Sequence, residues 1–322
     1  MMKTILLDFE PGTLSEEQLA LVQVTAPDMR LLVTRERAQV ERALDEIEIA
    51  AGGFPHDLLP QACNLRWLQQ WGAGADWLLH HPEAVEMDFI LTNTSGIHAI
   101  PVSEHILAFL FAFTRRLHQA VRAQERHAWT PQDQQTGLFE LAGKTMVLVG
   151  IGAIGARTAA MATALGLCVL GVRRDPGVSA PGVEAMFSPD WLLDLLPKAD
   201  FVVLVVPLTR ETQGLIGERE LRAMKPTAYL INVGRGGLLQ EDALIQALRE
   251  RWIAGAGLDV FETEPLPEDS PLWEMDNAII TSHYAGLTPH YTERALAIFL
   301  DNLQRYRAGE RLRNVVNKKL AY

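Results

Sequence analysis

Short apolar runs alternate with stretches of helical spacing through the first hundred residues. Apolar positions recur with helical spacing in segments 14–26 and 35–44, which is typical of amphipathic helices. Between such segments the apolar runs have the length of strands. These runs are 4–9, 29–34, 47–53, 65–70 and 88–93. Strands that alternate with helices in this way predict a small α/β domain with a parallel sheet.

A second series of apolar runs begins at residue 144 and continues to residue 283. Its members are nearly continuous in apolar residues, as strands covered by helices on both faces should be. The expected strands are 144–152, 166–172, 199–206, 227–234, 254–261 and 277–283. The chain is therefore predicted to be of the α/β class, with two doubly wound parallel-sheet domains.

Two long helical patterns flank the second series. Residues 103–118 predict a helix that is apolar nearly all round in its middle, so it should be buried on several sides, between domains or between two subunits. Residues 289–309 predict a final helix that packs back on the first domain. These features predict one domain of residues 1–100 and 287–322, with a second domain, 101–286, inserted into it. An exposed ILAFLFAF run would be a liability, and we therefore expect a homodimer held largely by the helix over 103–118.

Composition narrows the class of protein. The chain has 322 residues, of which 48% are hydrophobic, and a net charge of −11, which argue for a globular protein without a nucleic-acid or membrane partner. Its most apolar run, 106–113, is too short to cross a bilayer, and the first residues lack the pattern of a signal peptide. Cys63 and Cys168 lie in apolar or strand-like contexts without CxxC spacing. A reduced cytoplasmic protein with buried thiols is therefore expected.

The first candidate for chemistry is a glycine loop. Gly150, Gly152 and Gly155 form G-x-G-x-x-G directly after an expected strand and at the start of an expected helix. The first glycine permits a tight turn, the second lets a pyrophosphate approach the backbone, and the third allows close packing of helix and strand. The loop therefore predicts a dinucleotide-binding domain.

The strand that follows the glycine loop ends in Arg173, Arg174 and Asp175. An acid at this place accepts hydrogen bonds from the adenosine ribose and repels a 2′-phosphate, whereas an arginine pairs with that phosphate. The two arginines therefore favour NADP as the cofactor. NAD is the alternative, if the arginines are solvated loop charges and Asp175 receives the ribose.

Three polar residues follow three later strands. Arg235 comes after LINVG, Glu264 comes after GLDVF, and His283 ends AIITSH. Ligands of an open parallel sheet bind beyond the carboxyl ends of its strands, where residues far apart in sequence converge. An arginine holds a carboxylate bidentately, and a histidine oriented by an acid donates a proton to a developing alkoxide. The trio predicts hydride transfer to a ketone, although each residue alone also fits a turn, a loop or a strand end.

The segment WGAGAD, residues 71–76, follows an expected strand of the first domain. Its small residues leave backbone N–H groups bare, as in a nest suited to a carboxylate; a simple strand-to-helix turn is the alternative. His80, His81 and His98 lack a companion pattern for metal binding and are interpreted as surface or loop histidines. Trp129 fits two interpretations: an aromatic that reaches a neighbouring site across a dimer, or an ordinary packing side chain.

Taken together, these segments resemble the D-isomer-specific 2-hydroxyacid dehydrogenase family over nearly all of the chain. The order and spacing of seven landmarks carry the resemblance: VSEHILAFLFAFTRR, LAGKTMVLVGIGAIG, PLTRETQGLI, LINVGRGGLLQEDAL, GAGLDVFETEPLP, TSHYAG and NVVNKKLAY. The resemblance implies a Rossmann cofactor domain inserted in a flavodoxin-like substrate domain. It also implies NAD(P)-dependent reduction of a small 2-oxoacid, such as glyoxylate or hydroxypyruvate, to the D-2-hydroxyacid.

The resemblance also implies roles for individual residues. It makes His283 the acid/base, Glu264 its partner and Arg235 the substrate binder. It makes Ala73 and Gly74 the amides that bind the substrate carboxylate in a cleft between the domains. The cofactor contacts that it implies are Ala153, Ile154, Pro207, Thr212, Val233, Asp259 and Ala285. The full candidate cofactor site adds Gly150, Gly152, Gly155, Arg173, Arg174, Arg235 and His283.

Two positions depart from the family pattern. Many members have a proline in place of Ser282 and a histidine near Val206, and neither departure removes a proposed catalytic group.

Two other functions share the scaffold. A formate or phosphite dehydrogenase is one, but a formate enzyme is expected to have an amide where this chain has Glu264. A cofactor-sensing corepressor is the other, and the complete trio and the lack of a basic or disordered tail argue against it.

Overall fold

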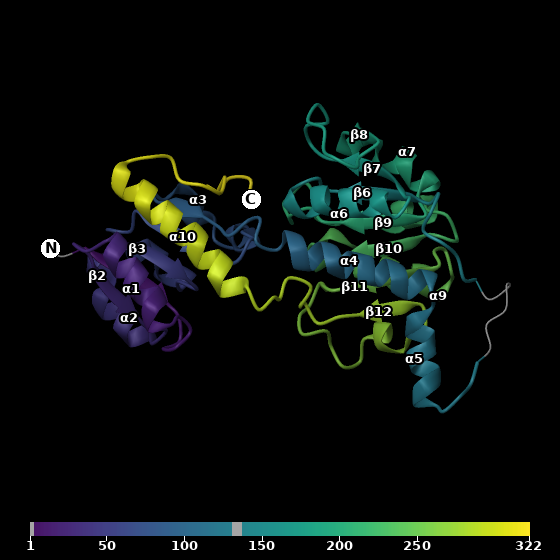
Figure 1. The fold of residues 1–322 in the computed structure, drawn as a ribbon, viewed down its shortest axis with the longest axis horizontal. Helices are drawn as coiled ribbons and strands as arrows, with labels where there is room; N and C mark the ends of the chain where they lie inside the picture. The colour runs from purple at the N-terminus through teal and green to yellow at the C-terminus, as the bar shows by residue number, and fades with distance from the viewer. Residues whose placement is uncertain (1–2, 131–136) are drawn as a thin grey trace. The chain divides into compact units, whose positions relative to one another are not determined.

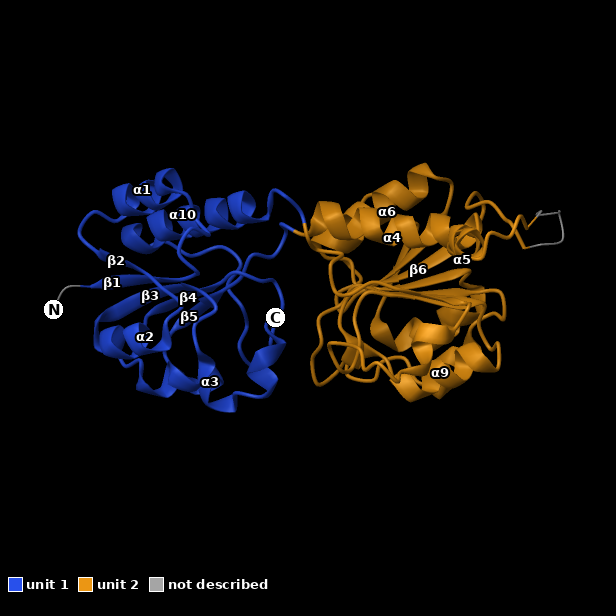
Figure 2. Cartoon of the chain, turned by 90° about the horizontal axis from the view of Figure 1, so that it is seen from below, with its two compact units in different colours: residues 1–97, 288–322 blue, residues 98–287 orange. Residues whose placement is uncertain are grey.

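The computed structural model describes residues 3–130 and 137–322, and the chain forms two compact units (Figures 1 and 2). Unit 1 consists of residues 1–97 and 288–322, and unit 2 of residues 98–287. The chain leaves unit 1 once and returns to it once, so unit 2 is an insertion. The sequence places the two boundaries at 100/101 and 286/287, and the structure places them at 97/98 and 287/288. Within the described ranges, no helix is long and apolar enough to cross a membrane.

Unit 1 is built on a five-stranded parallel sheet in the order β2-β1-β3-β4-β5. This is the strand order of flavodoxin-like domains, which reverses between β1 and β3. Each of the five apolar runs expected from the sequence forms one strand. They are β1 (Thr4–Asp8), β2 (Arg30–Val33), β3 (Ile47–Gly52), β4 (Trp67–Gln70) and β5 (Ile90–Thr92).

Helices cover both faces of this sheet (Figure 2). Ile5 and Leu7 of β1 pack under α1 and α10, whereas Leu6 packs under α2 and α3, as the alternation of a strand requires. The final helix, α10, belongs to unit 1, where Phe299 stacks on Trp67 with ring centroids 5.3 Å apart. The helices are α1 (Glu16–Thr25), α2 (Arg37–Ala43), α3 (Pro82–Glu86) and α10 (Tyr291–Ala308), with the 3₁₀ helices η1 (Leu44–Glu46), η2 (His56–Gln61) and η3 (Asp76–Leu79).

Unit 2 has a seven-stranded parallel sheet in the order β12-β11-β10-β9-β6-β7-β8. Counted from its first strand, β6, this is the Rossmann order with one further strand, β12, at the edge. The sequence predicts every strand except β8, whose sequence Ala-Met-Phe lacks the β-branched residues that mark the equally short β5 and β12. The strands are β6 (Thr145–Val149), β7 (Cys168–Val172), β8 (Ala185–Phe187), β9 (Phe201–Leu204), β10 (Tyr229–Asn232), β11 (Gly255–Leu258) and β12 (Ala278–Ile280).

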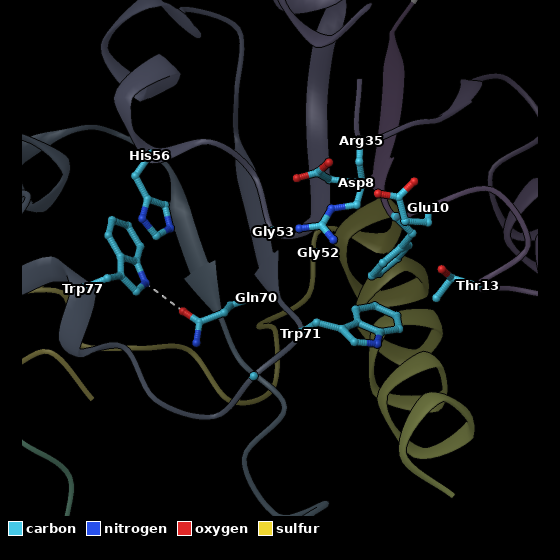
Figure 3. A pocket seen from close by; sticks show the side chains of 12 residues that line it. Asp8, Glu10, Thr13, Arg35, Gly52, Gly53, His56, Gln70, Trp71 and Trp77 are labelled. Atoms are coloured by element: carbon cyan, nitrogen blue, oxygen red, sulfur yellow. Dashed lines mark hydrogen bonds between the residues drawn. The ribbon is translucent and has the colours of Figure 1, made fainter. Parts of the chain in front are cut away.

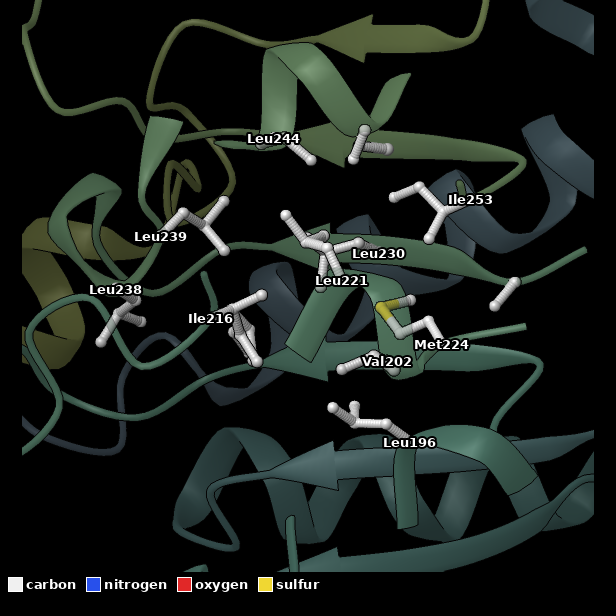
Figure 4. Close-up of a cluster of buried hydrophobic side chains, with 14 of the residues drawn as sticks. Leu196, Val202, Ile216, Leu221, Met224, Leu230, Leu238, Leu239, Leu244 and Ile253 are labelled. Carbon is white, nitrogen blue, oxygen red and sulfur yellow. The ribbon is translucent and has the colours of Figure 1, made fainter. Parts of the chain in front are cut away.

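Helices also cover both faces of the second sheet, with α4 and α6 on one side and α9 on the other (Figure 2). Met146 of β6 packs with Phe109 of α4 on the first side. On the other side, Val202 and Leu230 of the sheet meet Leu244 of α9 in a fully apolar cluster (Figure 4). The helices are α4 (Ala99–Thr114), α5 (Leu117–Glu125), α6 (Ala153–Ala164), α7 (Leu192–Leu195), α8 (Glu218–Ala223) and α9 (Glu241–Arg249), with the 3₁₀ helices η4 (Pro189–Trp191), η5 (Leu196–Lys198), η6 (Gly236–Leu238) and η7 (Pro271–Glu274).

The single helix expected over 103–118 is wrong in its extent, because the structure has two helices there. α4 ends at Thr114, and the backbone of Arg116 then enters the left-handed region with φ 53°. The ring of His118 closes the end of α4, since its Nδ1 lies 3.1 Å from the carbonyl oxygen of Ala112. Most of the apolar run is buried within unit 2 itself.

The prediction that both thiols are buried is also wrong. Cys63 is exposed in the turn after η2, and Cys168 is only partly buried at the start of β7. Desolvation and the neighbouring carboxylate of Glu184 raise the pKa of Cys168 to about 11. This thiol therefore stays protonated at neutral pH and is a poor nucleophile.

Candidate active site

Arg235, Glu264 and His283 lie just beyond the carboxyl ends of three neighbouring strands. Arg235 follows β10, Glu264 follows β11 and His283 follows β12. These strands are parallel and adjacent in the sheet, so their carboxyl ends meet at one edge. Ligands of open α/β sheets bind at this edge.

A short contact joins two members of the trio. His283 Nδ1 lies 2.6 Å from Glu264 Oε2, and Glu264 Oε1 accepts a hydrogen bond of 3.0 Å from the N–H of Phe261. The side chains of His283 and Glu264 are 49% and 34% exposed, so a ligand has access to the pair. Because the carboxylate holds Nδ1, the other ring nitrogen, Nε2, is the one left for proton exchange with a ligand.

The backbone of His283 is strained, and Asp259 holds it in place. The φ of His283 is 53°, a left-handed conformation that costs about 1–2 kcal/mol in a residue with a side chain. Its N–H donates to the carbonyl oxygen of Asp259 at 2.8 Å. The Asp259 carboxylate, which is almost completely buried, accepts the N–H groups of Tyr284 and Ala285 at 3.1 Å each. The buried charge thus fixes the conformation of the loop that carries His283.

His105 of α4, which the sequence analysis does not single out, supports the same loop. The hydroxyl of Thr281 donates to Asp259 Oδ1 at 2.6 Å, and His105 Nε2 lies 3.0 Å from the Thr281 oxygen. Burial lowers the pKa of His105, against the opposing effect of Asp259, so the neutral ring donates from Nε2 to Thr281. The sequence feature that could have identified His105 is a polar ring within a largely apolar helix. A polar group that is buried there needs a hydrogen-bond partner from another element.

Asn232, the last residue of β10, sets the conformation of the turn that carries Arg235. Asn232 is fully buried; its Nδ2 donates to the Arg235 carbonyl at 2.8 Å and its Oδ1 accepts the N–H of Gly234 at 3.1 Å. Arg235 is half-buried, and its Nη1 donates to the Gly234 carbonyl at 2.8 Å. A Cβ on Gly236 would lie 1.8 Å from the carbonyl carbon of Phe261, so only glycine fits where this turn meets the segment after β11.

The glycine loop has the geometry that a dinucleotide requires. Gly150 has φ 108°, and a Cβ on Gly155 would lie 1.9 Å from the Gly150 carbonyl oxygen, so both positions need glycine. At Gly152, just before α6, a Cβ would meet no atom within 4 Å, and no side chain caps the helix. The open space therefore lies at the N–H groups of the first turn of α6, where a pyrophosphate fits.

Arg173 and Arg174 follow β7, which is adjacent to β6 in the sheet. Arg173 is half-buried, whereas Arg174 is exposed and its Nη2 lies 2.7 Å from Glu211 Oε2. Asp175 Oδ1 accepts the N–H of Gly177 at 3.1 Å, so this carboxylate serves a local turn.

The other implied cofactor residues lie at the ends of neighbouring strands. Thr212 Oγ1 donates to the Pro207 carbonyl at 2.7 Å and closes the loop after β9. Asp259 and Ala285 contact each other through the hydrogen bond described above. Val233 is buried after β10, Ala153 is exposed and Ile154 is half-buried at the start of α6.

In unit 1, the segment after β4 has backbone donors that no other described residue accepts. Within the described residues, the N–H groups of Gly72, Ala73 and Gly74 donate no hydrogen bond. Their carbonyl groups are held instead: Ala73 accepts from Asn93 Nδ2 at 2.7 Å, and Gly74 accepts from Gln70 Nε2. Adjacent N–H groups of this kind form a nest for an anion such as a carboxylate.

The remaining residues singled out from the sequence have plain surroundings. Burial, to which the charge of Arg235 adds, lowers the pKa of His98, whose Nδ1 lies 3.2 Å from the Gly286 carbonyl. His80 is exposed, and His81 Nδ1 lies 3.0 Å from Glu83 Oε1. Trp129 is 94% exposed, so it belongs to no core formed by the described residues. Ser282 is exposed beside His283.

Comparison with known proteins points in the same direction as the geometry. Residues 107–285 match the family model described as the NAD binding domain of D-isomer specific 2-hydroxyacid dehydrogenase. A glyoxylate reductase of Korarchaeum cryptofilum (strain OPF8) is 37% identical over 271 residues, which are 82% of this chain and 80% of that protein.

Solved structures share the fold of the whole chain. A D-isomer specific 2-hydroxyacid dehydrogenase from Xanthobacter autotrophicus Py2, in complex with NADPH and MES, has a TM-score of 0.85 and 29% identity and covers 100% of both chains. An NADPH-dependent glyoxylate/hydroxypyruvate reductase from Sinorhizobium meliloti, in complex with NADP and sulfate, has a TM-score of 0.84 and 27% identity and also covers 100% of both chains.

Proposed function

The chain belongs to the D-isomer specific 2-hydroxyacid dehydrogenase family, and we propose that it reduces a small 2-oxoacid of the glyoxylate or hydroxypyruvate type to the D-2-hydroxyacid with NADPH. As a member of this family it is an NAD(P)-dependent oxidoreductase. The observation that carries the proposal is the 2.6 Å contact of His283 with Glu264 beside the turn of Arg235. It supports a proton donor and a carboxylate-binding cation at the ends of neighbouring strands.

The proposed reaction requires a proton at the carbonyl oxygen of the substrate. His283 donates this proton from Nε2, while Glu264 holds Nδ1 and orients the ring. Arg235 binds the substrate carboxylate through its planar guanidinium and polarises the carbonyl. The N–H groups of Ala73 and Gly74 bind the same carboxylate. When bound, the reduced nicotinamide supplies a hydride to the carbonyl carbon.

NADPH is proposed as the preferred cofactor. Arg173 and Arg174 stand at the end of β7, where a cation pairs with the 2′-phosphate of the adenosine ribose. The local turn made by Asp175 and the two related structures with NADPH or NADP support the same preference. The residues that would hold the dinucleotide are Gly150, Gly152, Ala153, Ile154, Gly155, Pro207, Thr212, Val233, Arg235, Asp259, His283 and Ala285.

We further propose that the enzyme is a cytoplasmic homodimer. Phe111 of α4 is 39% exposed, and Leu117 and Val121 of α5 are 51% and 55% exposed, which leaves apolar surface for a second copy to cover. The thiols of Cys63 and Cys168 are both free, which suits a reducing compartment.

A substrate panel tests the proposed reaction. The protein is assayed with glyoxylate, hydroxypyruvate and pyruvate, each with NADPH and with NADH, by the loss of reduced-nicotinamide absorbance. We expect turnover of glyoxylate or hydroxypyruvate, faster with NADPH than with NADH. NADPH binding without turnover of any 2-oxoacid would instead favour a cofactor-sensing protein and overturn the proposal.

The role of His283 has a separate test. His283→Asn is expected to lower kcat by about 10²–10⁴-fold, the usual contribution of general acid catalysis. Steady-state kinetics over neutral pH measure this loss, and circular dichroism checks that the variant is folded. Turnover near the wild-type rate at every pH would mean that His283 is not the proton donor.

A further inference from the structure

A pocket of about 480 Å³ opens at the carboxyl ends of the strands of unit 1 (Figure 3). We call it the strand-end pocket. Asp8 ends β1, Arg35 follows β2, Gly53 follows β3 and Trp71 follows β4, and all four line it. The order of the strands reverses between β1 and β3, and ligands of open α/β sheets bind at such a reversal. The volume of the strand-end pocket is in the range of small-molecule sites and is larger than a two-carbon acid would fill.

Two charged side chains at this pocket, Asp8 and Arg35, make no hydrogen bond or close ion pair among the described residues. Asp8 is only 5% exposed, yet its carboxylate accepts no hydrogen bond there. The guanidinium of Arg35, at the exposed rim, donates none. Burial raises the pKa of Asp8, against the opposing charge of Arg35. The fully buried side-chain atoms without a partner do not include the Asp8 oxygens, so the carboxyl group reaches the open pocket and is available to a ligand.

Gly53 keeps the space beside these two side chains open. A Cβ on Gly53 would lie 3.5 Å from Asp8 Oδ2 and 3.9 Å from Arg35 Nη2, with no other atom within 4 Å. A ligand oxygen near this point therefore has an acceptor and a donor within reach. A hydroxyl group suits both, because it donates to a carboxylate and accepts from a guanidinium. A second carboxylate on the ligand would be repelled by Asp8 and by Glu10, which also lines the pocket.

Aromatic side chains form other parts of the wall. His56 stacks on Trp77 with ring centroids 3.8 Å apart (Figure 3). Trp77 Nε1 donates to Gln70 Oε1 at 2.8 Å, and Gln70 Nε2 donates to the carbonyl of Gly74. The wall of the pocket is thus bonded to the loop whose N–H groups are proposed to bind the substrate carboxylate. A pocket of aromatic walls with a few placed polar groups is typical of a small-molecule site.

We propose that the strand-end pocket holds the hydroxylated carbon chain of a longer 2-oxoacid, with Asp8 and Arg35 bound to a hydroxyl group beside Gly53. This inference rests on the proposed reduction of 2-oxoacids and names the class of substrate: an acid whose chain carries hydroxyl groups beyond the carbonyl. Glyoxylate has no such chain and does not reach Asp8 or Arg35.

Steady-state kinetics with NADPH test the inference on three substrates. 2-Oxogluconate carries hydroxyl groups, 2-oxohexanoate has the same number of carbons without them, and glyoxylate is the short reference. The wild type is expected to have a kcat/KM for 2-oxogluconate at least about tenfold above that for 2-oxohexanoate, because an apolar chain would exclude water from the Asp8 carboxylate without offering it a hydrogen bond. Asp8→Asn and Arg35→Met should each lower the ratio of kcat/KM for 2-oxogluconate to that for glyoxylate by about tenfold or more.

Gly53→Ala tests the geometry directly. Its methyl group would occupy the space beside Asp8 and Arg35 at ordinary contact distances, and the backbone of Gly53 is not left-handed, so the fold tolerates it. The ratio should again fall by about tenfold. The matched controls Asp45→Asn and Arg42→Met change exposed residues of unit 1 outside the pocket and should keep the wild-type ratio.

Each outcome has a distinct meaning. Equal kcat/KM for the two six-carbon acids in the wild type overturns the inference while glyoxylate reduction stands. Unchanged ratios in Asp8→Asn, Arg35→Met and Gly53→Ala overturn it as well. A wild type that reduces none of the three substrates overturns the proposed function instead.

Discussion

His283 contacts the protein through Nδ1 and its backbone N–H, which leaves Nε2 as the ring atom for a ligand. Other residues also use some of their atoms for contacts within the protein and leave other atoms to a ligand. The carbonyl groups of Ala73 and Gly74 accept hydrogen bonds while their N–H groups donate none to the described residues. Asp8 is largely buried, and its carboxylate likewise accepts no hydrogen bond from that part of the chain. At the scale of single residues, the protein thus fixes a group through one set of atoms and leaves another set to the ligand, which is how a site is preorganised.

The preference for NADPH is a residue-scale prediction. Replacing Arg173 and Arg174 together with alanine should weaken NADPH binding by about 10–150-fold, the equivalent of about 1.5–3 kcal/mol for a charge-assisted hydrogen bond. NADH binding should change little, because NADH has no 2′-phosphate. Titration of the nicotinamide fluorescence measures both dissociation constants.

The single variants separate the two arginines. Arg174 already pairs with Glu211, so Arg173→Ala is expected to account for most of the loss and Arg174→Ala for less. A wild type that binds NADH more tightly than NADPH, or a double variant that keeps its NADPH affinity, would show that the pair is a solvated surface feature.

At the scale of secondary-structure elements, the glycine loop between β6 and α6 allows a matched pair of substitutions. Gly155→Ala would place a methyl group 1.9 Å from the Gly150 carbonyl oxygen, so helix and strand must move apart. Overpacking of this kind costs about 1–3 kcal/mol, and both the melting temperature and the affinity for NADPH should fall. Gly152→Ala, where a Cβ meets no atom, should keep the melting temperature and lower only the affinity.

Calorimetry and cofactor titration of the two variants decide this prediction. A Gly152→Ala protein that binds NADPH as tightly as the wild type would show that the pyrophosphate does not approach this glycine. A Gly155→Ala protein with an unchanged melting temperature would contradict the close packing of α6 on β6.

The elements that the sequence predicts well are those whose pattern is local. Strands covered on both faces are continuous apolar runs, and the structure confirms every expected strand in both sheets. β8 was not predicted because its three residues, Ala-Met-Phe, include none of the β-branched residues found in the equally short β5 and β12. The break between α4 and α5 depends on the left-handed backbone of Arg116 and on the contact of His118 with Ala112, which no spacing of apolar residues expresses.

The candidate site also contains some residues that the sequence predicts and others that it does not. Polar residues after parallel strands converge by topology, so Arg235, Glu264 and His283 could be grouped from the sequence. The contact of His105 with Thr281 joins residues 176 positions apart on a helix and a loop, and it depends on tertiary packing. The lack of a hydrogen bond to the Asp8 carboxylate within residues 3–130 and 137–322 likewise becomes visible only when the neighbouring donors are placed.

At the scale of the whole molecule, the prediction concerns assembly. The core of unit 2 buries most of the apolar residues of α4, so the run ILAFLFAF is not itself the surface that a partner must cover. Leu117 and Val121 of α5 remain 51% and 55% exposed, and they lie four positions apart on one face of the helix. A twofold interface would use this face from both copies, so each substitution acts twice.

We expect sedimentation at micromolar concentration to show a dimer in the wild type and a monomer in Leu117→Lys/Val121→Lys, because four charges would be buried in the interface. The control Leu21→Lys/Val24→Lys changes two residues of α1 that are 53% and 77% exposed and should remain a dimer. A monomeric wild type would remove the homodimer from the proposal. A dimer that survives the α5 substitutions would place the interface elsewhere. Because an interface that stabilises the folded state makes the melting temperature depend on protein concentration, the wild type should also melt higher as its concentration rises, and the α5 variant should not.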